Sequence, residues 1–371
     1  MNHTRGRETT TPSLDTEHPY ESENFITEDG HVNTELLPAR TWLKAIAPYK
    51  TPNLNRSIIE LVITFIPFIS LWALAVWTSS ISYFLTIPVC VLAGFFLVRL
   101  FLIQHDCSHG SFFKSRAAND WVGRVIGVLT VTPYDLWKKA HLIHHASHGN
   151  LDKRGIGDIM TLTIDEYEAR TKWGKWRYRF YRNPFVLFGI GPIFVFLLHQ
   201  RLPIGFMKSG LKYWISTMGT NLAMATIIIG GIYWLGWMPF LVTYLCITCI
   251  AAAIGVWLFY VQHQFEDVLW DKDENWQVHD AALYGSTHYD LPPVLRWLTA
   301  NIGIHHVHHL YARIPYYNLS KILKAHPKLG EIRRLTLWES FKTVRLKLWD
   351  AKERKLVTYR EAKLSWAKQT T

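Results

Sequence analysis

Charged residues are missing from two long stretches of this 371-residue sequence. No Asp, Glu, Lys or Arg occurs from Leu61 to Val98, and none occurs from Tyr213 to Phe265. Each stretch is longer than the roughly 20 apolar residues that cross a bilayer once as a helix, so each predicts two spans joined by a short turn. The expected spans are residues 57–78, 81–103, 213–234 and 239–261.

The sequence also has few cysteines and lacks an apolar segment near its N-terminus. Only four cysteines are present, and three of them fall within the predicted spans, so the sequence predicts no disulfide framework. The first forty residues contain no apolar stretch behind a basic start. We therefore expect no cleavable secretory signal, and we expect residues 1–45 to form a flexible cytoplasmic tail.

The distribution of basic residues predicts an orientation. Six Lys and Arg precede the first uncharged stretch, seventeen lie between the two stretches and seventeen follow the second, whereas neither predicted turn contains any. Because cytoplasmic loops collect Lys and Arg, both pairs of spans should be hairpins that enter the membrane from the cytoplasm. Both termini and the middle segment should then be cytoplasmic, and we expect no nucleic-acid partner.

Histidine, in contrast, is concentrated. Ten of the eighteen histidines lie in three short windows: HDCSH at 105–109, HLIHHASH at 141–148 and HHVHH at 305–309. Core packing explains this crowding poorly, because an unpaired imidazole is costly to bury. The rings recur at i,i+3 and i,i+4, spacings that share one face of a helix. Neutral imidazoles placed in this way make a metal site.

The second and third windows share the pattern HxxHH, and the first contains HxxxH. Their eight imidazoles exceed the three or four protein ligands of one zinc site, so we expect two metal ions. His263, at the end of the fourth predicted span, is a ninth candidate, because ionisable residues at that depth are usually functional. The predicted ligands are His105, His109, His141, His144, His145, His263, His305, His308 and His309.

Two further apolar segments must not cross the membrane if one site gathers all three windows. If residues 183–200 crossed alone, the third window would lie on the opposite side from the first two. This segment is short for a span and is broken by two prolines and two glycines. We therefore expect it to be interfacial or re-entrant. The same argument applies to residues 121–133.

The expected fold is an all-α integral membrane protein. Four transmembrane helices in two hairpins should lie beneath a cytoplasmic helical cap that holds a histidine-rich di-metal site. We place this domain at residues 46–350, followed by a basic C-terminal tail at residues 351–371.

Four motifs resemble those of the membrane-bound fatty acid desaturases. They are HDCSHGSFF, HLIHHASHGNLDKRGIGD, WLFYVQHQFED and NIGIHHVHHLYARIPYYNL. The resemblance is greatest to bacterial acyl-lipid desaturases of the omega-6 (Δ12) and Δ5 types, and it covers residues 50–350 with the order and spacing of the motifs intact. It implies a protein of the bacterial inner membrane that introduces a double bond into the acyl chain of a membrane lipid.

The resemblance also implies cofactors. The nine histidines match the family's motif positions for two iron ions (Fe2+), with O2 as co-substrate. Two positions depart from the family pattern. Ser108 stands where glycine is more usual, and Phe259 stands where related acyl-CoA desaturases have an asparagine that helps to hold a metal-bound water.

Electrons must come from a separate carrier, a ferredoxin or a small haem protein, because the sequence has no flavin or nucleotide fingerprint and no HPGG haem motif. Lys138, Lys139, Lys153 and Arg154 are candidates for docking an acidic carrier. Attraction of these bases to anionic lipid headgroups is the competing interpretation.

Two other functions remain open at this stage. A fatty acyl hydroxylase would use the same iron site with a different outcome, and a divalent-metal transporter or sensor would use the same histidines. Transport sites usually lie near the membrane midplane, whereas the predicted ligands lie at the cytoplasmic ends of spans. The sequence leaves double-bond position, chain length, lipid carrier and oligomeric state open.

Overall fold

The computed structural model describes residues 39–370. Most of the predicted tail, residues 1–38, lies outside the described part. The described residues of that tail, 39–45, form all but the last residue of α1 (Ala39–Ile46), which is followed by the short helix η3 (Ala47–Lys50). The backbone N–H of Ala39 donates to the Asp280 carboxylate at 3.1 Å, so this helix is anchored to a distant part of the chain.

Four helices are long and apolar enough to cross a membrane: α2 (Leu54–Ser79), α3 (Tyr83–His109), α9 (Leu211–Leu235) and α10 (Trp237–His263). They contain the predicted spans, except that the second helix begins two residues later than expected. The turns fall where the sequence placed them. Residues 80–82 separate α2 from α3, and Gly236, with a φ of 81° that favours glycine, separates α9 from α10.

Helix ends are set by local chemistry. The Asn53 side chain accepts a hydrogen bond from the backbone N–H of Arg56 and caps α2. Ser82 caps α3 in the same way. At the other end of α3, Gly110 has a φ of 67° and stops the helix directly after His109. The first histidine window therefore occupies the final turns of α3.

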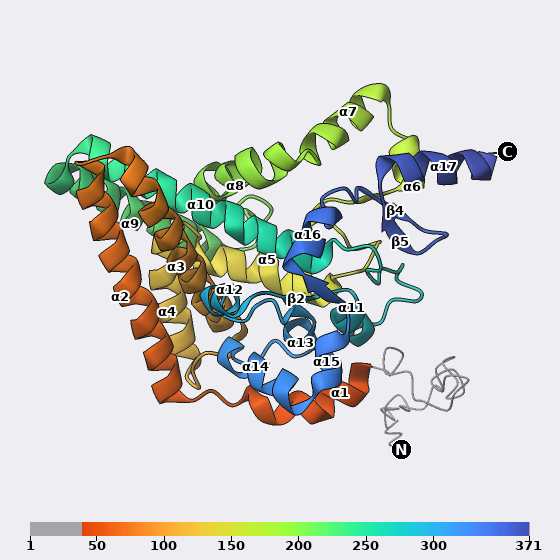
Figure 1. Cartoon of the computed structure of the whole chain (residues 1–371), viewed down its shortest axis with the longest axis horizontal. Helices are drawn as coiled ribbons and strands as arrows, with labels where there is room; N and C mark the ends of the chain where they lie inside the picture. Colours follow the sequence, from red (N-terminus) through yellow and green to blue (C-terminus); the bar gives the residue numbers. More distant parts are fainter. Residues whose placement is uncertain (1–38, 371) are drawn as a thin grey trace, which may run out of the picture. The chain divides into compact units, whose positions relative to one another are not determined.

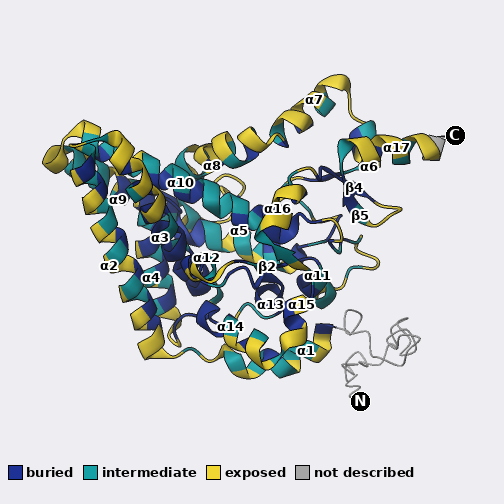
Figure 2. Cartoon of the chain, in the orientation of Figure 1, coloured by how far each residue is buried: buried dark blue, intermediate teal, exposed yellow. Residues whose placement is uncertain are grey.

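The four long helices differ in their burial. α3 lies inside the bundle and contacts α2, α4 (Arg116–Leu129) and α10, and its second half is almost fully buried. Large apolar side chains of α2 and α9 are exposed, among them Ile66 and Leu222. Much of α2 is coloured as exposed (yellow) in Figure 2. Exposed apolar surface of this extent is unsuited to water and suits lipid.

The cap consists of shorter helices around α5 (Tyr134–Ser147) and α13 (His305–Leu310). In Figure 1, α13 lies near the centre among the blue C-terminal helices. The other cap helices are α11 (Val278–Tyr284), α12 (Pro293–Leu298), α14 (Tyr316–Ala325), α15 (Pro327–Glu331) and α16 (Leu337–Thr343).

An arm follows the short helix α6 (Ile164–Glu168). It begins with α7 (Lys172–Tyr181) and bends by 59° into residues 186–201. This second part contains η4 (Val186–Ile190), α8 (Gly191–Ile193), η5 (Phe194–Leu198) and η6 (His199–Arg201). By length and composition the bent pair qualifies as a fifth candidate span.

The protein is mostly helical, but the prediction of an all-α fold needs correction because five short strands are present. β2 (His288–Asp290) pairs with β3 (Arg334–Thr336) in parallel. β1 (Leu162–Thr163) pairs in parallel with β4 (Leu348–Asp350), which pairs antiparallel with β5 (Lys355–Val357). The last helix, α17 (Tyr359–Thr370), packs against this sheet, so residues of the predicted C-terminal tail are folded.

A buried ion pair joins the bundle to the cap. Glu60 on α2 and Arg99 on α3 are each 1% exposed and form a salt bridge. The hydroxyl of Tyr316, on α14, donates to the same carboxylate at 2.9 Å. The Arg99 guanidinium also lies 4.3 Å from the centre of the Trp297 ring, on α12. One carboxylate therefore connects two long helices to the cap.

Substitution Glu60→Gln is expected to destabilise the protein, because it leaves the Arg99 cation buried without a carboxylate. Breaking a buried pair in this way costs about 3–5 kcal/mol. Arg56→Gln removes the half-exposed partner of the same carboxylate and should cost less than about 1 kcal/mol. Thermal unfolding of the two purified variants in detergent measures the difference. Equal unfolding temperatures would contradict a clamping role for the buried pair.

Candidate metal centre

The first two predicted ligands lie on the last turns of α3. His105 is 4% exposed and His109 is partly exposed. They are four residues apart, so their rings lie on one face of the helix, with centroids 4.9 Å apart. Because Gly110 ends the helix immediately afterwards, this face opens toward the cap and not toward another turn of α3.

The second window lies on α5, which begins after Pro133. His141 and His145 are four residues apart and face α3. The Trp137 indole, one turn earlier, stacks on the His141 ring at 4.5 Å with the planes inclined by 13°. His144 lies on a neighbouring face and is 1% exposed.

The remaining four predicted ligands come from two other helices. His263 is the last residue of α10, and the third window forms α13. The rings of His305, His308 and His309 are all buried. Helices from three distant parts of the sequence, together with the end of α10, therefore deliver imidazoles to the same place.

These imidazoles form two groups. In the first group, the candidate ligand nitrogens all lie within 4.8 Å of one another; its members are His105, His109, His141, His145 and His308. The Nε2 atom of His141 is 3.0 Å from Nε2 of His109 and 3.1 Å from Nε2 of His145. His308 Nε2 is 3.2 Å from His145 Nε2.

The second group contains His144, His263 and His309, whose ligand nitrogens meet the same limit. The Nε2 atoms of His144 and His263 are 3.2 Å apart. His305 joins this group through its Nε2 atom, which lies 3.0 Å from Nε2 of His263. The structure thus brings all nine predicted ligands into two adjacent groups.

The spacing of these nitrogens fits metal ions. A neutral imidazole carries a single N–H, so three Nε2 atoms that converge around His141 cannot all be satisfied by hydrogen bonds to one another. At a metal–nitrogen distance of about 2.1 Å, two ligands at right angles are about 3.0 Å apart. His309 fits the same explanation, because both its ring nitrogens are buried without a hydrogen-bond partner among the described residues.

The histidines on the cap helices α5 and α13 are also in the protonation state that a metal ligand needs. Burial, and then the electrostatic effect of neighbouring imidazoles, holds the pKa values of His141, His145 and His308 well below their usual range. These rings are therefore neutral near pH 7, the form with a lone pair for a metal.

One carboxylate holds an imidazole in place, and a second carboxylate lies beside another imidazole without a hydrogen bond to it. Nδ1 of His144 lies 2.6 Å from the Asp158 carboxylate, which fixes the tautomer and leaves Nε2 free to face His263. Asp106 lies 3.5 Å from Nδ1 of His105, and its other oxygen accepts from the backbone N–H of Tyr316 at 2.7 Å.

The histidines outside the repeated pattern have different partners. The ring nitrogens of His148 and His306 lie 2.7 and 2.8 Å from the backbone carbonyls of Gly285 and Leu329. His148 nevertheless belongs, with His144 and Asp158, to a third cluster of potential ligands. His148 follows His144 by four residues, a spacing that places both rings on one face of a helix and is the signal in the sequence for their proximity.

One departure from the family pattern now has a structural consequence. The Phe259 ring lies 5.1 Å from the His144 ring and 5.0 Å from the His263 ring. A phenyl ring therefore lies beside the second group and offers no polar atom there. Sequence reasoning did not foresee the stacking of Trp137 on His141, although their spacing of four residues on one helix is a signal for it.

Four apolar helices, together with nine imidazoles gathered from α3, α5, α10 and α13, define a helical membrane protein with a histidine-rich cluster of the metal-binding type. Residues 82–341 match the family model described as fatty acid desaturase. The chain therefore belongs to the fatty acid desaturase family, which confirms the resemblance noted in the sequence, and it is an enzyme of that family.

Individual relatives agree with this assignment. A fatty acid desaturase of Bacillus subtilis (strain 168) is 45% identical over 86% of this chain and 90% of its own length. Two relatives from Synechocystis are each 28% identical. An sn-1 acyl-lipid omega-3 desaturase (ferredoxin) matches 73% of this chain and 76% of its own length. An sn-1 oleoyl-lipid 12-desaturase matches 68% and 72%.

Substitution Asp158→Asn is expected to weaken metal binding at the second group, because the His144 tautomer loses its carboxylate. Such partners typically contribute 10–100-fold to metal affinity. Titration of the metal-free, folded protein with Fe2+ under anaerobic conditions measures this. Asp165→Asn, an exposed acid on α6, is the control and should bind as the unmodified protein does. Unchanged affinity in Asp158→Asn would show that Asp158 does not support a metal ligand.

Proposed function

We propose that this protein is an O2-dependent desaturase that introduces a double bond into the acyl chain of a membrane lipid, using a di-iron centre. The observation that carries the proposal is the convergence of nine imidazoles in two groups at the ends of apolar helices. The acyl-lipid substrates named for the Synechocystis relatives support a lipid substrate here.

We assign the two groups to two iron ions. His105, His109, His141, His145 and His308 would hold one, and His144, His263, His305 and His309 would hold the other. Two ferrous ions supply the reaction of O2 with an unactivated methylene, which no amino-acid side chain performs. The protein would position the acyl chain and exclude water, and Asp158 would orient His144.

The proposed membrane arrangement follows from the site. In our proposal α2 with α3, and α9 with α10, form two hairpins that enter from the cytoplasm, because the basic residues lie on the side of the histidines. The segment from 183 to 200 then does not cross. The convergence of all three windows supports this, since a lone crossing would separate the third window from the others. The site and both termini would face the cytoplasm of a bacterial inner membrane.

We also propose the domain boundaries expected from the sequence. Residues 46–350 would form the desaturase domain, between an N-terminal segment at 1–45 and a C-terminal segment at 351–371. The family match at 82–341 lies within this range.

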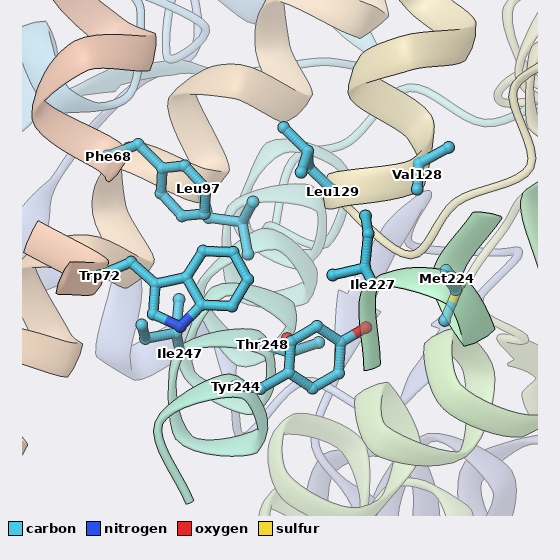
Figure 3. A pocket seen from close by; sticks show the side chains of 10 residues that line it. All are labelled: Phe68, Trp72, Leu97, Val128, Leu129, Met224, Ile227, Tyr244, Ile247 and Thr248. Atoms are coloured by element: carbon cyan, nitrogen blue, oxygen red, sulfur yellow. The ribbon is translucent and has the colours of Figure 1, made fainter. Parts of the chain in front are cut away.

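The acyl chain would enter between the long helices. A cavity of about 20 Å³ lies among α2, α3, α4, α9 and α10 (Figure 3). Its walls are almost entirely apolar, with the Trp72, Leu97 and Tyr244 side chains among them. This volume holds about one water molecule, so the side chains must move apart to admit a chain of methylenes.

Electrons would come from a separate carrier, a ferredoxin or a small haem protein. Desaturation removes two hydrogen atoms from the acyl chain, and reducing O2 to two waters takes two further electrons and two protons. The bases proposed for docking are mostly neutralised. Lys138 pairs with Asp120, and Lys153 pairs with Asp273. Arg154 pairs with Glu166, so of the four only Lys139 is left without an ion pair among the described residues.

The proposed activity is tested by the fatty acid profile of aerated cells that express the protein together with a ferredoxin system. Mass spectrometry should find a new unsaturated acid only with intact His308, and His308→Ala should abolish it because one iron loses a ligand. His279→Ala, a histidine outside both groups, should retain it.

Other outcomes would favour the alternatives. A hydroxy acid in place of an unsaturated acid would identify a hydroxylase. No new product, together with exchangeable zinc in place of two tightly held irons, would favour a metal transporter or sensor and overturn the desaturase proposal.

Leu97→Trp should block the proposed acyl path. Leu97 is 3% exposed and lines the cavity, and overpacking a filled site costs about 1–3 kcal/mol. We expect a roughly tenfold or greater fall in conversion, measured by the same lipid profile at equal protein in the membrane. Leu92→Trp, on the outward face of the same helix at 42% exposure, is the control and should convert normally. Normal conversion by Leu97→Trp would place the acyl chain elsewhere.

A further inference from the structure

Helix α7 has two contrasting faces. On the inner face, Tyr178 is buried and its hydroxyl donates to the Lys347 carbonyl at 2.5 Å. On the outer face, Trp173, Trp176 and Phe180 are 63%, 53% and 52% exposed. These three residues follow the i, i+3, i+7 spacing that places side chains in one row along a helix.

The three outer rings stack on one another. Trp173 and Trp176 have ring centroids 4.6 Å apart and planes inclined by 10°. Trp176 and Phe180 are 5.5 Å apart and inclined by 14°. A row of this kind is unfavourable in water and marks an interaction surface. Tryptophan is enriched where a membrane meets water, because its ring is apolar and its N–H is polar.

The charges on α7 are all of one sign. Its sequence, KWGKWRYRFY, contains four bases and no acid. Lys175 pairs with Glu168, and Arg179 donates to the Tyr167 hydroxyl. Lys172 and Arg177 are exposed and have no ion pair among residues 39–370. These two cations flank the aromatic row and complement an anionic surface.

The aromatic row continues into the surface that faces lipid. After α7 the arm exposes Phe185, Ile190, Phe194 and Leu198, and α9 then begins with exposed Leu211. Figure 1 shows α7 and α8 as one arm leading away from α10, and Figure 2 shows much of this arm in yellow. The exposed apolar surface of the long helices therefore extends along the arm to Trp173.

We propose that the outer face of α7 is a docking surface for the headgroup region of an anionic lipid leaflet. Trp173, Trp176 and Phe180 lie among the headgroups, and Lys172 and Arg177 bind their phosphates. The proposal requires only that the long helices span a membrane, and it does not depend on the identity of the metal.

Docking of the outer face of α7 on lipid would also affect the surroundings of the histidine cluster, because residues on the inner side of the same helix contact them. The Tyr181 hydroxyl accepts a hydrogen bond from the backbone N–H of Met160, two residues after Asp158. Arg182, just beyond α7, is fully buried and donates to the side-chain oxygen of Gln264, the neighbour of His263. A helix held at the lipid surface therefore fixes two segments that carry or support candidate ligands.

The test uses the full-length protein in vesicles that contain a photoreactive lipid with its reactive group at the headgroup. One preparation is phosphatidylcholine alone, and the other is mixed with phosphatidylglycerol. Mass spectrometry then locates the labelled peptides. We expect labelling of residues 172–181 that is stronger in the anionic vesicles. Each base near an anionic surface contributes about 1 kcal/mol, so Lys172→Gln with Arg177→Gln should reduce that labelling roughly tenfold or more.

The control pair, Lys324→Gln with Lys328→Gln, removes two exposed bases from α14 and α15 and should leave the labelling of α7 unchanged. Absence of α7 labelling in the unmodified protein would overturn the proposal, as would equal labelling after loss of Lys172 and Arg177. Labelling of α7 only by a probe at the centre of the acyl chains would show that the arm crosses the membrane. Loss of labelling on addition of an acidic ferredoxin would show that this face binds a protein.

Discussion

The convergence of nine imidazoles is the constraint on which this structure depends. The lone pair of each ring must face a point shared with other rings, and not a protein donor. Rings from α3, α5, α10 and α13 meet this condition together. Four helices must therefore bring their histidine-bearing segments to one level, and the rest of the fold can be understood as the means of holding them there.

The ends of α3 and α10 set that level. Gly110 stops α3 one residue after His109, and α10 ends at His263. The Glu60 carboxylate then ties α2 and α3 to α14 through Arg99 and the Tyr316 hydroxyl. The backbone N–H of Tyr316 also donates to Asp106, beside His105. A buried ion pair of this kind contributes little net stability by comparison with apolar packing, but it fixes how the cap sits on the long helices.

The sequence predicted the long helices and the nine clustered histidines, because both signals are local. Missing charge identifies a helix of membrane-spanning length without knowledge of its neighbours, and HxxHH places rings on one side of any helix. The division of the nine into two groups was not predictable. His144 and His145 are adjacent in sequence but lie in different groups. The His144 ring meets His263 at the end of α10, whereas the His145 ring meets His109 at the end of α3.

The pairing of distant segments could not be predicted from the sequence either. β1 pairs with β4, far along the chain, and a strand of two or three residues leaves no alternation in the sequence to detect. The ion pair between Glu60 and Arg99, in contrast, could have been predicted from the sequence. They are the last charge before and the first charge after the uncharged stretch, so an antiparallel arrangement of α2 and α3 brings them to the same level.

Arg182 shows how closely the arm and the cluster depend on each other. Its guanidinium is fully buried and has no carboxylate partner among its hydrogen bonds. It donates instead to oxygen atoms of Thr161, Gln264 and Leu346, which belong to three separate segments. Nε has no hydrogen-bond partner among the described residues, so the two terminal nitrogens carry all of these contacts. A buried cation is costly without such partners, and the contacts therefore favour one arrangement of these segments around it. Because Gln264 follows His263, the end of α10 is fixed by the same contacts that attach α7 to the cap.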